Sequence, residues 1–426
     1  MILSFHDYTY FTAFLIIWQF LWNYDKVLQV MDNKTNKLLE RNVEQVLPSK
    51  EELAELMEKR KIKLYYGIDP TSPNLHLGHA VQLRKLAKFQ ELGHEVILLF
   101  GTFTAQIGDP SGHNSKRETL SKKEVDENLK TYKKQASKIL DVSKATIKRN
   151  EEWLAEMDLE KMLKLASHFT TSQLLKRDLF QRRLKNNKEI WLHELFYPIM
   201  QGYDSVAMDI DLELGATDQT FNMLIGRDLQ KEYNNKEKFV LTTPMLTGLD
   251  GRGMSKSRGN TVNLTDSPQD MFGKLMSLND KLIPEYFKLC TNESLEKIEE
   301  VKNKLEQGNI NPKSLKVELA KKIVTLYHSK EEAEEAEEEF NKVFKEKKYP
   351  SDMPEFSIDS FQKDTMEIDE LLVKLELASS KTEAKNLIDQ GGIKIDGEEQ
   401  NNWNKEIKIE KGKVIQRGKK TFVKLV

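Results

Sequence analysis

The chain has very little cysteine and no excess of charge of either sign. Cys290 is the single cysteine among 426 residues, which excludes an intramolecular disulfide and is typical of a protein in the reducing cytoplasm. The 66 Lys and Arg residues nearly balance the 68 Asp and Glu residues, so any surface that binds nucleic acid must be local. A chain of this length forms roughly two to four domains. We therefore expect a cytoplasmic protein with several domains.

The chain also lacks an apolar run that could span a membrane. A transmembrane helix needs roughly 20 apolar residues, and the run from Tyr8 to Trp22 is shorter and contains Gln19. No basic residue precedes this run, as one would in a secretory signal. Ordinary soluble composition begins at Met31. We expect residues 1–30 to be a translation-start extension outside the fold, with no stable membrane association; a membrane-surface anchor is the alternative.

The first half of the chain carries the pattern of a βαβ unit. Residues 63–68 are rich in β-branched and aromatic side chains, which predicts a strand that ends in a dense turn cluster. Apolar spacing predicts a helix over 78–92 and a second strand over 95–100. The loop between them brings His76 and His79 to a helix start, where anions bind. On spacing alone, a metal-binding pair or a solvated helix start would also fit.

A second loop rich in glycine and hydroxyl groups follows the strand at 95–100. Residues 101–112 again lie at a strand end, and two consecutive crossovers of this kind predict a doubly wound parallel sheet. His113, Lys116 and Arg117 come directly afterwards, where they would flank a bound phosphate. Taken alone, the loop fits a simple tight turn equally well.

Polar residues also gather on one predicted helix further downstream. Tyr197, Gln201 and Asp204 are four and three residues apart, so they share one helix face. Because the surrounding run is apolar and buried polar groups need partners, this face predicts a polar ligand. Elsewhere in this part of the chain, the sequence predicts a helix over 121–140 and a strand over 205–214.

The last third of the chain changes character. Charged helices are predicted over about 268–344, and a polar, proline-containing segment at 349–365 indicates a linker. A capping box at 380–383 and a hairpin turn at 396–397 predict a small separate domain with helices and strands. From Lys405 onward the chain is strongly basic, which favours contact with the phosphate backbone of a nucleic acid.

Two short motifs carry a resemblance to a known family. Residues 76–79 read His-Leu-Gly-His and residues 254–257 read Met-Ser-Lys-Ser, in this order and separated by a domain-sized stretch. Together they resemble the two signatures of class I aminoacyl-tRNA synthetases, and the sequence between them is similar to the tyrosyl enzymes of bacterial type. The pattern over 377–397 resembles the S4 RNA-binding domain. The resemblance covers about residues 31–426.

This resemblance implies an α/β fold with a doubly wound, Rossmann-like catalytic domain, an α-helical middle domain and a small α+β domain. The expected boundaries are 31–262 for the catalytic domain, 263–346 for the helical tRNA-recognition domain, 347–366 for a linker and 367–426 for the S4 RNA-binding domain.

The implied activity is that of a tyrosine–tRNA ligase. Such an enzyme activates L-tyrosine with ATP, releases pyrophosphate, and transfers the tyrosyl group to the 3′-terminal adenosine of tRNA(Tyr). Positioning and charge stabilisation supply most of this catalysis, so no nucleophilic side chain is needed. The resemblance also implies that Mg²⁺ accompanies ATP, that no cofactor is tightly bound, and that two chains form a homodimer through the helices around 170–191.

The resemblance assigns an ATP site to the two motif loops. It implies that several of their side chains hold the phosphates. The expected catalytic residues are Thr71, His76, His79, Lys256 and Ser257, the last two at the pyrophosphate leaving group. The other expected ATP-binding residues are Gly67, Asp69, Gly78 and Asp218, with Asp218 at the ribose.

A tyrosine site and an RNA surface follow in the same way. The resemblance implies that Tyr65 and Asp204 hold the phenolic hydroxyl of tyrosine. The residues expected around its amino end are Asp109, Tyr197, Gln201 and Gln219. The residues expected to bind RNA are Lys381, Lys385 and Arg417.

The sequence departs from the family pattern at two positions. The first lysine of the second family motif is Gly253 here, although Arg252 lies beside it. The lysine that some relatives carry after Gly-Asp-Pro-Ser-Gly is His113 here, so Arg117 is the surer cation of that loop.

Three other functions compete with the tyrosyl enzyme. A tryptophanyl relative is disfavoured by Tyr65, by the polar helix face and by the terminal RNA domain. An RNA-binding regulator or splicing helper that lost activity is disfavoured by the intact His76, His79 and Lys256. A small-molecule adenylyltransferase would not need a terminal RNA domain.

Overall fold

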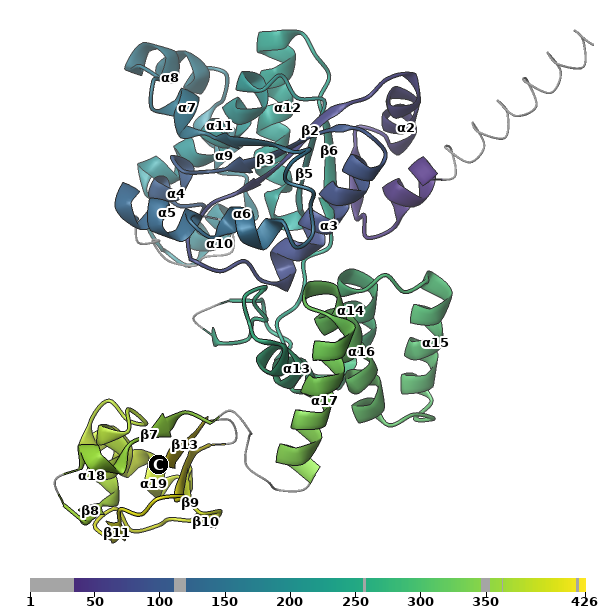
Figure 1. Ribbon diagram of the computed structural model, residues 1–426. Coiled ribbons are helices and arrows are strands. Elements are labelled where there is room, and N and C mark those ends of the chain that lie inside the picture. The colour runs from purple at the N-terminus through teal and green to yellow at the C-terminus, as the bar shows by residue number, and fades with distance from the viewer. Residues whose placement is uncertain (1–33, 111–119, 256–257, 346–352, 362, 419–420) are drawn as a thin grey trace, which may run out of the picture. The chain divides into compact units, whose positions relative to one another are not determined.

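The computed structural model of the protein describes residues 34–110, 120–255, 258–345, 353–361, 363–418 and 421–426 (Figure 1). The expected start-site extension lies outside these residues. The chain divides into two compact units, Met1–Lys330 and Glu331–Val426. The expected catalytic domain and most of the expected helical domain therefore fall into one unit. No helix in the described part of the chain is long and apolar enough to cross a bilayer.

The larger unit is built around a six-stranded sheet with the order β1-β6-β5-β2-β3-β4. Only β1 runs antiparallel to its neighbour within this sheet, and the other pairings are parallel. The strands are β1 (Gln45–Leu47), β2 (Lys63–Ile68), β3 (Glu95–Phe100), β4 (Thr146–Arg149), β5 (Leu212–Ala216) and β6 (Phe239–Thr243). The continuous apolar run of β3, buried over five consecutive residues, is typical of a parallel strand covered on both faces.

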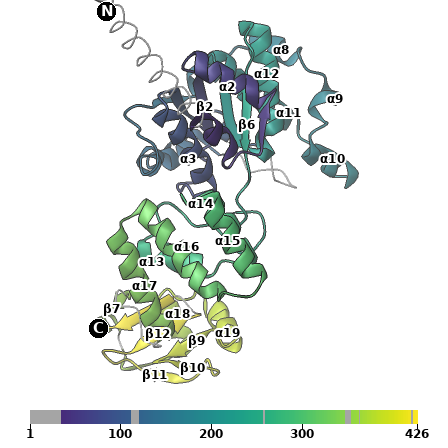
Figure 2. The same ribbon diagram turned by 90° about the vertical axis from the view of Figure 1, so that its right-hand side faces the viewer.

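Helices cover both faces of this sheet, which confirms the doubly wound α/β fold. Figure 2 shows α3 on one side of β2 and β6, and α11 and α12 on the other. The helices between the strands are α2 (Lys50–Lys59), α3 (Leu77–Glu91), α4 (Thr104–Ile107), α5 (Lys122–Leu129), α6 (Tyr132–Ala136), α7 (Glu151–Leu154), α8 (Leu159–Ala166), α9 (Thr171–Leu174), α10 (Asp178–Lys185), α11 (Leu192–Ala207), the 3₁₀ turn η1 (Thr217–Gln219) and α12 (Thr220–Asn234).

The chain order reverses between β2 and β5, which are hydrogen-bonded neighbours in the sheet. In open parallel sheets, ligands bind outside the carboxyl ends of the strands at such a switch point. The polar loops that follow β2, β3 and β5 therefore meet at the position expected for a binding site.

After β6 the chain forms the helical part of the same unit. Its elements are α13 (Pro268–Met276), η3 (Asp280–Leu282), α14 (Ile283–Cys290), α15 (Leu295–Glu306) and α16 (Pro312–Tyr327). Arg84 of α3 donates to the Thr291 backbone carbonyl just after α14, at 2.7 Å. Cys290 is buried there, and burial raises the pKa of its thiol to about 12. This cysteine is therefore part of the core and not a reactive thiol.

The structure corrects two of the predicted elements. The helix expected over 121–140 is broken into α5 and α6 at Lys130 and Thr131, and the Thr131 hydroxyl donates there to the carbonyl of Pro73 at 3.0 Å. The strand expected over 205–214 begins only at Leu212, because α11 continues to Ala207. Asp209, with φ of 49°, then turns the chain from helix to strand.

The smaller unit begins with α17 (Lys330–Lys345) and ends in a compact α+β fold. A five-stranded sheet has the order β10-β9-β12-β13-β7, and β8 pairs with β11. The elements are β7 (Glu355–Phe356), η4 (Ile358–Ser360), β8 (Thr365–Glu367), α18 (Ile368–Lys374), α19 (Lys381–Asp389), β9 (Ile393–Ile395), β10 (Glu398–Glu399), β11 (Glu406–Lys408), β12 (Val414–Arg417) and β13 (Thr421–Leu425). Because β7 and β8 belong to these sheets, the fold starts within the segment expected to be a linker.

Two local predictions for this unit can be compared with the structure. Asp396 and Gly397 both have positive φ, 51° and 85°, and they form the tight turn between β9 and β10. At the start of α19, Ser380 accepts from the Glu383 backbone N–H as expected. The Glu383 carboxylate, however, accepts from the Ser379 N–H at 2.7 Å, so the reciprocal half of the capping box lies one residue earlier.

Candidate active site

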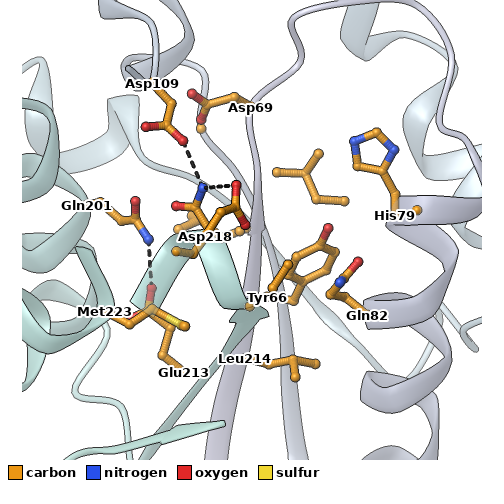
Figure 3. A pocket seen from close by; sticks show the side chains of 18 of the residues that line it. Tyr66, Asp69, His79, Gln82, Asp109, Gln201, Glu213, Leu214, Asp218 and Met223 are labelled. Atoms are coloured by element: carbon orange, nitrogen blue, oxygen red, sulfur yellow. Dashed lines mark hydrogen bonds between the residues drawn. The ribbon is translucent and has the colours of Figure 1, made fainter. Parts of the chain in front are cut away.

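A pocket of about 300 Å³ opens at the carboxyl ends of β2, β3 and β5 and extends along α11. Figure 3 shows its polar side chains converging from the two sides of the sheet. All of the expected tyrosine- and ATP-binding residues that the structure describes line this pocket. They are Tyr65, Gly67, Asp69, Thr71, His76, Gly78, His79, Asp109, Tyr197, Gln201, Asp204, Asp218 and Gln219.

The two histidines of the first motif are held by the start of α3. His76 is the N-cap, and its Nδ1 accepts from the Gly78 N–H at 3.2 Å. The Nδ1 atom of His79 accepts from the His76 N–H, also at 3.2 Å. Because each neutral ring accepts at Nδ1, its proton sits on Nε2, which makes Nε2 the donor. The rings lie 4.0 Å apart, centre to centre, so the two donors act on neighbouring positions.

Gly78 allows this arrangement because a side chain would not fit. A Cβ atom at this position would lie 2.9 Å from the His76 ring. The N-terminus of α3 therefore presents two imidazoles and a bare backbone, and such a helix start favours phosphate groups.

Asp69 lies at the end of β2 and is held by two hydroxyl groups. Tyr197 of α11 donates to Asp69 Oδ2 at 2.9 Å, and Thr104 donates to Oδ1 at 2.8 Å. Gly101 makes room for this cluster, since a Cβ there would lie 1.9 Å from Asp69 Oδ1. Burial, followed by the charges of Asp69 and Asp109, raises the pKa of Tyr197 well above its usual value. Tyr197 is therefore a neutral donor.

Asp109 anchors the side of the pocket next to η1. It pairs with Arg177 at 3.2 Å and accepts from Gln219 Nε2 at 2.8 Å. Asn222 of α12 then donates to both Gln219 and Gln201, at 3.1 and 2.8 Å. A chain of hydrogen bonds thus connects Asp109, Gln219 and Gln201, three of the four residues expected around the amino end of tyrosine.

The deep end of the pocket holds Tyr65 and Asp204, which are 1% and 3% exposed. Asp204 accepts from the Trp153 indole at 2.8 Å and from Asn150 Nδ2 at 3.3 Å. Burial raises the pKa of Asp204 well above its usual value and outweighs the hydrogen bonds from Trp153 and Asn150, which lower it. The Tyr65 hydroxyl lies 3.1 Å from Ser205 Oγ. These two residues line the same pocket but are bonded to different neighbours.

The second motif is only partly described. Lys256 and Ser257 lie outside the described residues, as do His113, Lys116 and Arg117. Met254 lines the pocket, and His76 forms a β-bridge with Asn263, so the segments on both sides of the motif lie at the site. Arg252, the cation beside Gly253, pairs with Asp250 and is 66% exposed.

All three residues expected to bind RNA have partners within the smaller unit. Lys385 stacks over the Trp403 ring at 3.5 Å, and Arg417 pairs with Glu383 at 2.9 Å. Lys381 lies on the surface, 3.3 Å from Glu370. Lys385 and Arg417 therefore also have structural roles in this fold.

Comparisons with known proteins identify the family of this chain. The family model for class I tRNA synthetases (W and Y) matches residues 57–345, and the model for the SYY-like C-terminal domain of tyrosine–tRNA ligases matches residues 345–425. The tyrosine–tRNA ligase of Carboxydothermus hydrogenoformans is 44% identical over 399 residues, which span 92% of this chain and 97% of that protein. The chain belongs to the tyrosine–tRNA ligases. The ligase of Thermotoga maritima is similar to it at 45% identity, over 91% of this chain and 96% of that protein.

Solved structures support the fold of this ligase. A tyrosyl-tRNA synthetase from Archaeoglobus fulgidus, crystallised with L-tyrosine, has a TM-score of 0.58 at 26% identity and covers 72% of this chain and 99% of its own. The C-terminally truncated mitochondrial enzyme of Aspergillus nidulans has a TM-score of 0.60 at 20% identity, over 75% of this chain and all of its own.

Sequence reasoning missed the residues that hold the site residues in place. Trp153 and Asn150 support Asp204, Arg177 supports Asp109, and Glu213 supports Gln201 through a hydrogen bond of 3.1 Å. Only Glu213 left a clear signal, because it is a charged residue inside an apolar strand. The other supports come from segments whose proximity depends on the tertiary fold.

Proposed function

We propose that the pocket binds tyrosine and ATP side by side and that this ligase forms tyrosyl-adenylate there. The observation that carries the proposal is the convergence of all described tyrosine- and ATP-binding candidates on one cavity at the switch point of the sheet. The tyrosine carboxylate attacks the α-phosphate of ATP, and pyrophosphate leaves. The tyrosyl group then passes to the 3′-terminal adenosine of tRNA(Tyr).

In this proposal the ATP phosphates lie at the N-terminus of α3. The Nε2 donors of His76 and His79, with Thr71, stabilise charge that develops on the phosphates during transfer. Gly67, Asp69 and Gly78 lie against the nucleotide, and Asp218 binds the ribose. Burial raises the pKa of Asp218. Lys256 and Ser257 act on the leaving pyrophosphate.

Tyrosine occupies the space between η1 and the deep end of the pocket. Its ammonium group faces the acidic side formed by Asp109 with Tyr197, Gln201 and Gln219. Its phenol reaches Tyr65 and Asp204. Since the charged end meets a carboxylate and the hydroxyl meets hydrogen-bonding groups, both ends of the substrate find partners.

Mg²⁺ enters with ATP as part of the substrate complex. Among the residues that the structure describes, no group of three or more His, Cys, Asp or Glu side chains is arranged to hold a metal ion. The phosphates therefore supply the main ligands of the ion, which is common for nucleotide-bound Mg²⁺.

We further infer a cytoplasmic homodimer that joins through the helices around 170–191. Apolar side chains at the end of this region support it, since Trp191 and Leu192 are 40% and 71% exposed. Light scattering gives the mass in solution: two chains per particle are expected, and a particle of one chain would contradict the inference.

Calorimetry with a non-hydrolysable tyrosyl-adenylate analogue tests the assignment of the pocket. We expect one site per chain, and we expect Asp109→Asn to weaken binding about tenfold or more, as for a charged hydrogen bond. Asp158→Asn is the matched control, because Asp158 caps α8 on the surface and asparagine caps equally well. Unchanged binding in Asp109→Asn would remove the amino end of tyrosine from this side of the pocket.

A further inference from the structure

A buried ion pair lies directly behind the pocket. Glu213 of β5 and Lys238, just before β6, have side chains that are 2% and 0% exposed. Glu213 also lines the pocket. The Lys238 ammonium group donates to Glu213, to Ser205 Oγ at 2.8 Å and to the Met223 carbonyl at 3.0 Å. All three of its protons are therefore used.

The crossing of α11 and α12 is shaped to admit this ammonium group. A Cβ atom on Gly226 of α12 would lie 2.5 Å from Lys238 Nζ and 3.0 Å from Ser205 Oγ. A buried ion pair adds little stability compared with apolar side chains of similar volume. We therefore explain the pair by the neighbouring side chains that it orients, and not by the stability that it adds.

On one side, the pair orients the amide of Gln201. Glu213 Oε1 accepts from Gln201 Nε2 at 3.1 Å, as Figure 3 shows. An ionised carboxylate can only accept, so the nitrogen of the amide must face Glu213 and its oxygen must face the other way. That oxygen accepts from Asn222 at 2.8 Å, and its second lone pair can accept from the ammonium group of an amino acid.

On the other side, the pair orients the hydroxyl of Tyr65. Ser205 donates to Glu213 Oε2 at 3.3 Å and accepts from Lys238. Because the single proton of Ser205 is used, the Tyr65 hydroxyl donates to Ser205 Oγ across their 3.1 Å separation. The Tyr65 oxygen then presents a lone pair, which accepts the phenolic proton of tyrosine. Phenylalanine has no proton to offer it.

We propose that Glu213 and Lys238 form a positioning pair that fixes the donor and acceptor pattern at both ends of the tyrosine subsite. The pair sets specificity for the substrate without touching its reacting atoms. This inference rests on the proposed assignment of the pocket to tyrosine.

Glu213→Gln tests the pair, because a glutamine of the same shape can both donate and accept and no longer fixes its neighbours. We expect KM for tyrosine to rise about threefold to tenfold, as for one or two weakened hydrogen bonds, while KM for ATP is unchanged. The kcat/KM ratio of tyrosine to phenylalanine should fall. In competition binding, the preference for tyrosine over 3-(4-hydroxyphenyl)propionate, which lacks the amino group, should also decrease.

Two further variants separate positioning from stability. Ser205→Ala removes the branch to Tyr65 and one partner of Lys238, but it keeps the hydrogen bond from Gln201 to Glu213. It should therefore lower the kcat/KM ratio of tyrosine to phenylalanine and leave the preference for the amino group intact. Asp211→Asn is the matched control, because Asp211 is a buried carboxylate two residues earlier that pairs with Arg60 at 2.6 Å. It should lower the thermal unfolding temperature without changing either ratio.

Wild-type ratios in Glu213→Gln would overturn the proposal. If that variant does not fold, Ser205→Ala decides alone, and an unchanged tyrosine-to-phenylalanine ratio overturns it. A wild-type enzyme that does not prefer tyrosine to phenylalanine would instead contradict the proposed function.

Discussion

Asp204 and Tyr65 take their properties mainly from burial, which raises the pKa of both side chains. No residue of the sequence near Asp204 shows that Trp153 and Asn150 will donate to it, because only the tertiary fold brings the start of α7 to Asp204 of α11. The motif residues His76 and His79 could be predicted, since their roles depend on the local start of one helix. The charge of Glu213 within an apolar strand was a signal, but its pairing with Lys238 could not be predicted, because an ion pair between residues of neighbouring strands requires the strand order.

Replacing Tyr65 by phenylalanine tests the deep end of the pocket. We expect kcat/KM for tyrosine to fall, and the loss of transition-state stabilisation to be about 0.5–1.5 kcal/mol, as for one neutral hydrogen bond. The difference in kcat/KM between tyrosine and phenylalanine should narrow. KM for ATP should not change. Tyr286→Phe is the control, because it removes a buried phenol that bonds to the Thr247 carbonyl at 2.7 Å. The same specificity ratio in Tyr65→Phe as in the native enzyme would mean that other residues hold the phenol.

At the scale of elements, the strands and helices with regular patterns were predicted well. β2 and β3 have the predicted bounds, and α3 differs from its prediction by one residue at each end. The failures at 121–140 and 205–214 have a common cause. The break between α5 and α6 and the turn at Asp209 both leave the apolar spacing of the sequence nearly unchanged, so the pattern shows neither of them.

The turn between α3 and β3 makes stability depend on pH. His94 is 7% exposed, and its Nδ1 accepts from the Ile62 N–H at 3.3 Å. Burial, with a smaller effect from the nearby Lys61 charge, lowers the pKa of His94 to about 4. The unfolded chain, with a histidine pKa near roughly 6.5, therefore binds more protons than the folded chain between these values. The stability that neutral His94 contributes is thus present above pH 6.5 or so and is lost as pH falls toward about 4.

Urea unfolding at several pH values measures this effect. Between roughly pH 6.5 and 4, the free energy of unfolding of the native protein should fall by at most about 3 kcal/mol more than that of His94→Gln. The reason is that glutamine can accept from the Ile62 N–H without titrating. Parallel curves for the two proteins would show that another group is responsible.

At the scale of the whole molecule, we expect the two compact units to have different roles. The described residues that line the pocket all precede Pro268, whereas the smaller unit matches the C-terminal domain of tyrosine–tRNA ligases. The sequence predicted this separate domain from its basic tail and turn pattern. It placed the start too late, because β7 and β8 are too short to leave a strand pattern.

A chain that ends at Lys345 tests this division. Tyrosine-dependent pyrophosphate exchange should remain nearly intact, because the pocket is complete. Aminoacylation should fall through weaker tRNA binding, and the dependence of that binding on salt should flatten as phosphate contacts are lost. Full charging of tRNA at low enzyme concentration would remove the RNA-binding role from the smaller unit.

We expect one pocket to activate tyrosine with ATP. ATP–pyrophosphate exchange with each of the twenty amino acids, supplied one at a time to the full chain, measures this step directly. We predict strong exchange with tyrosine, weak exchange with phenylalanine and background exchange with tryptophan. Equal exchange with tryptophan and tyrosine, or none with any amino acid, would contradict the account.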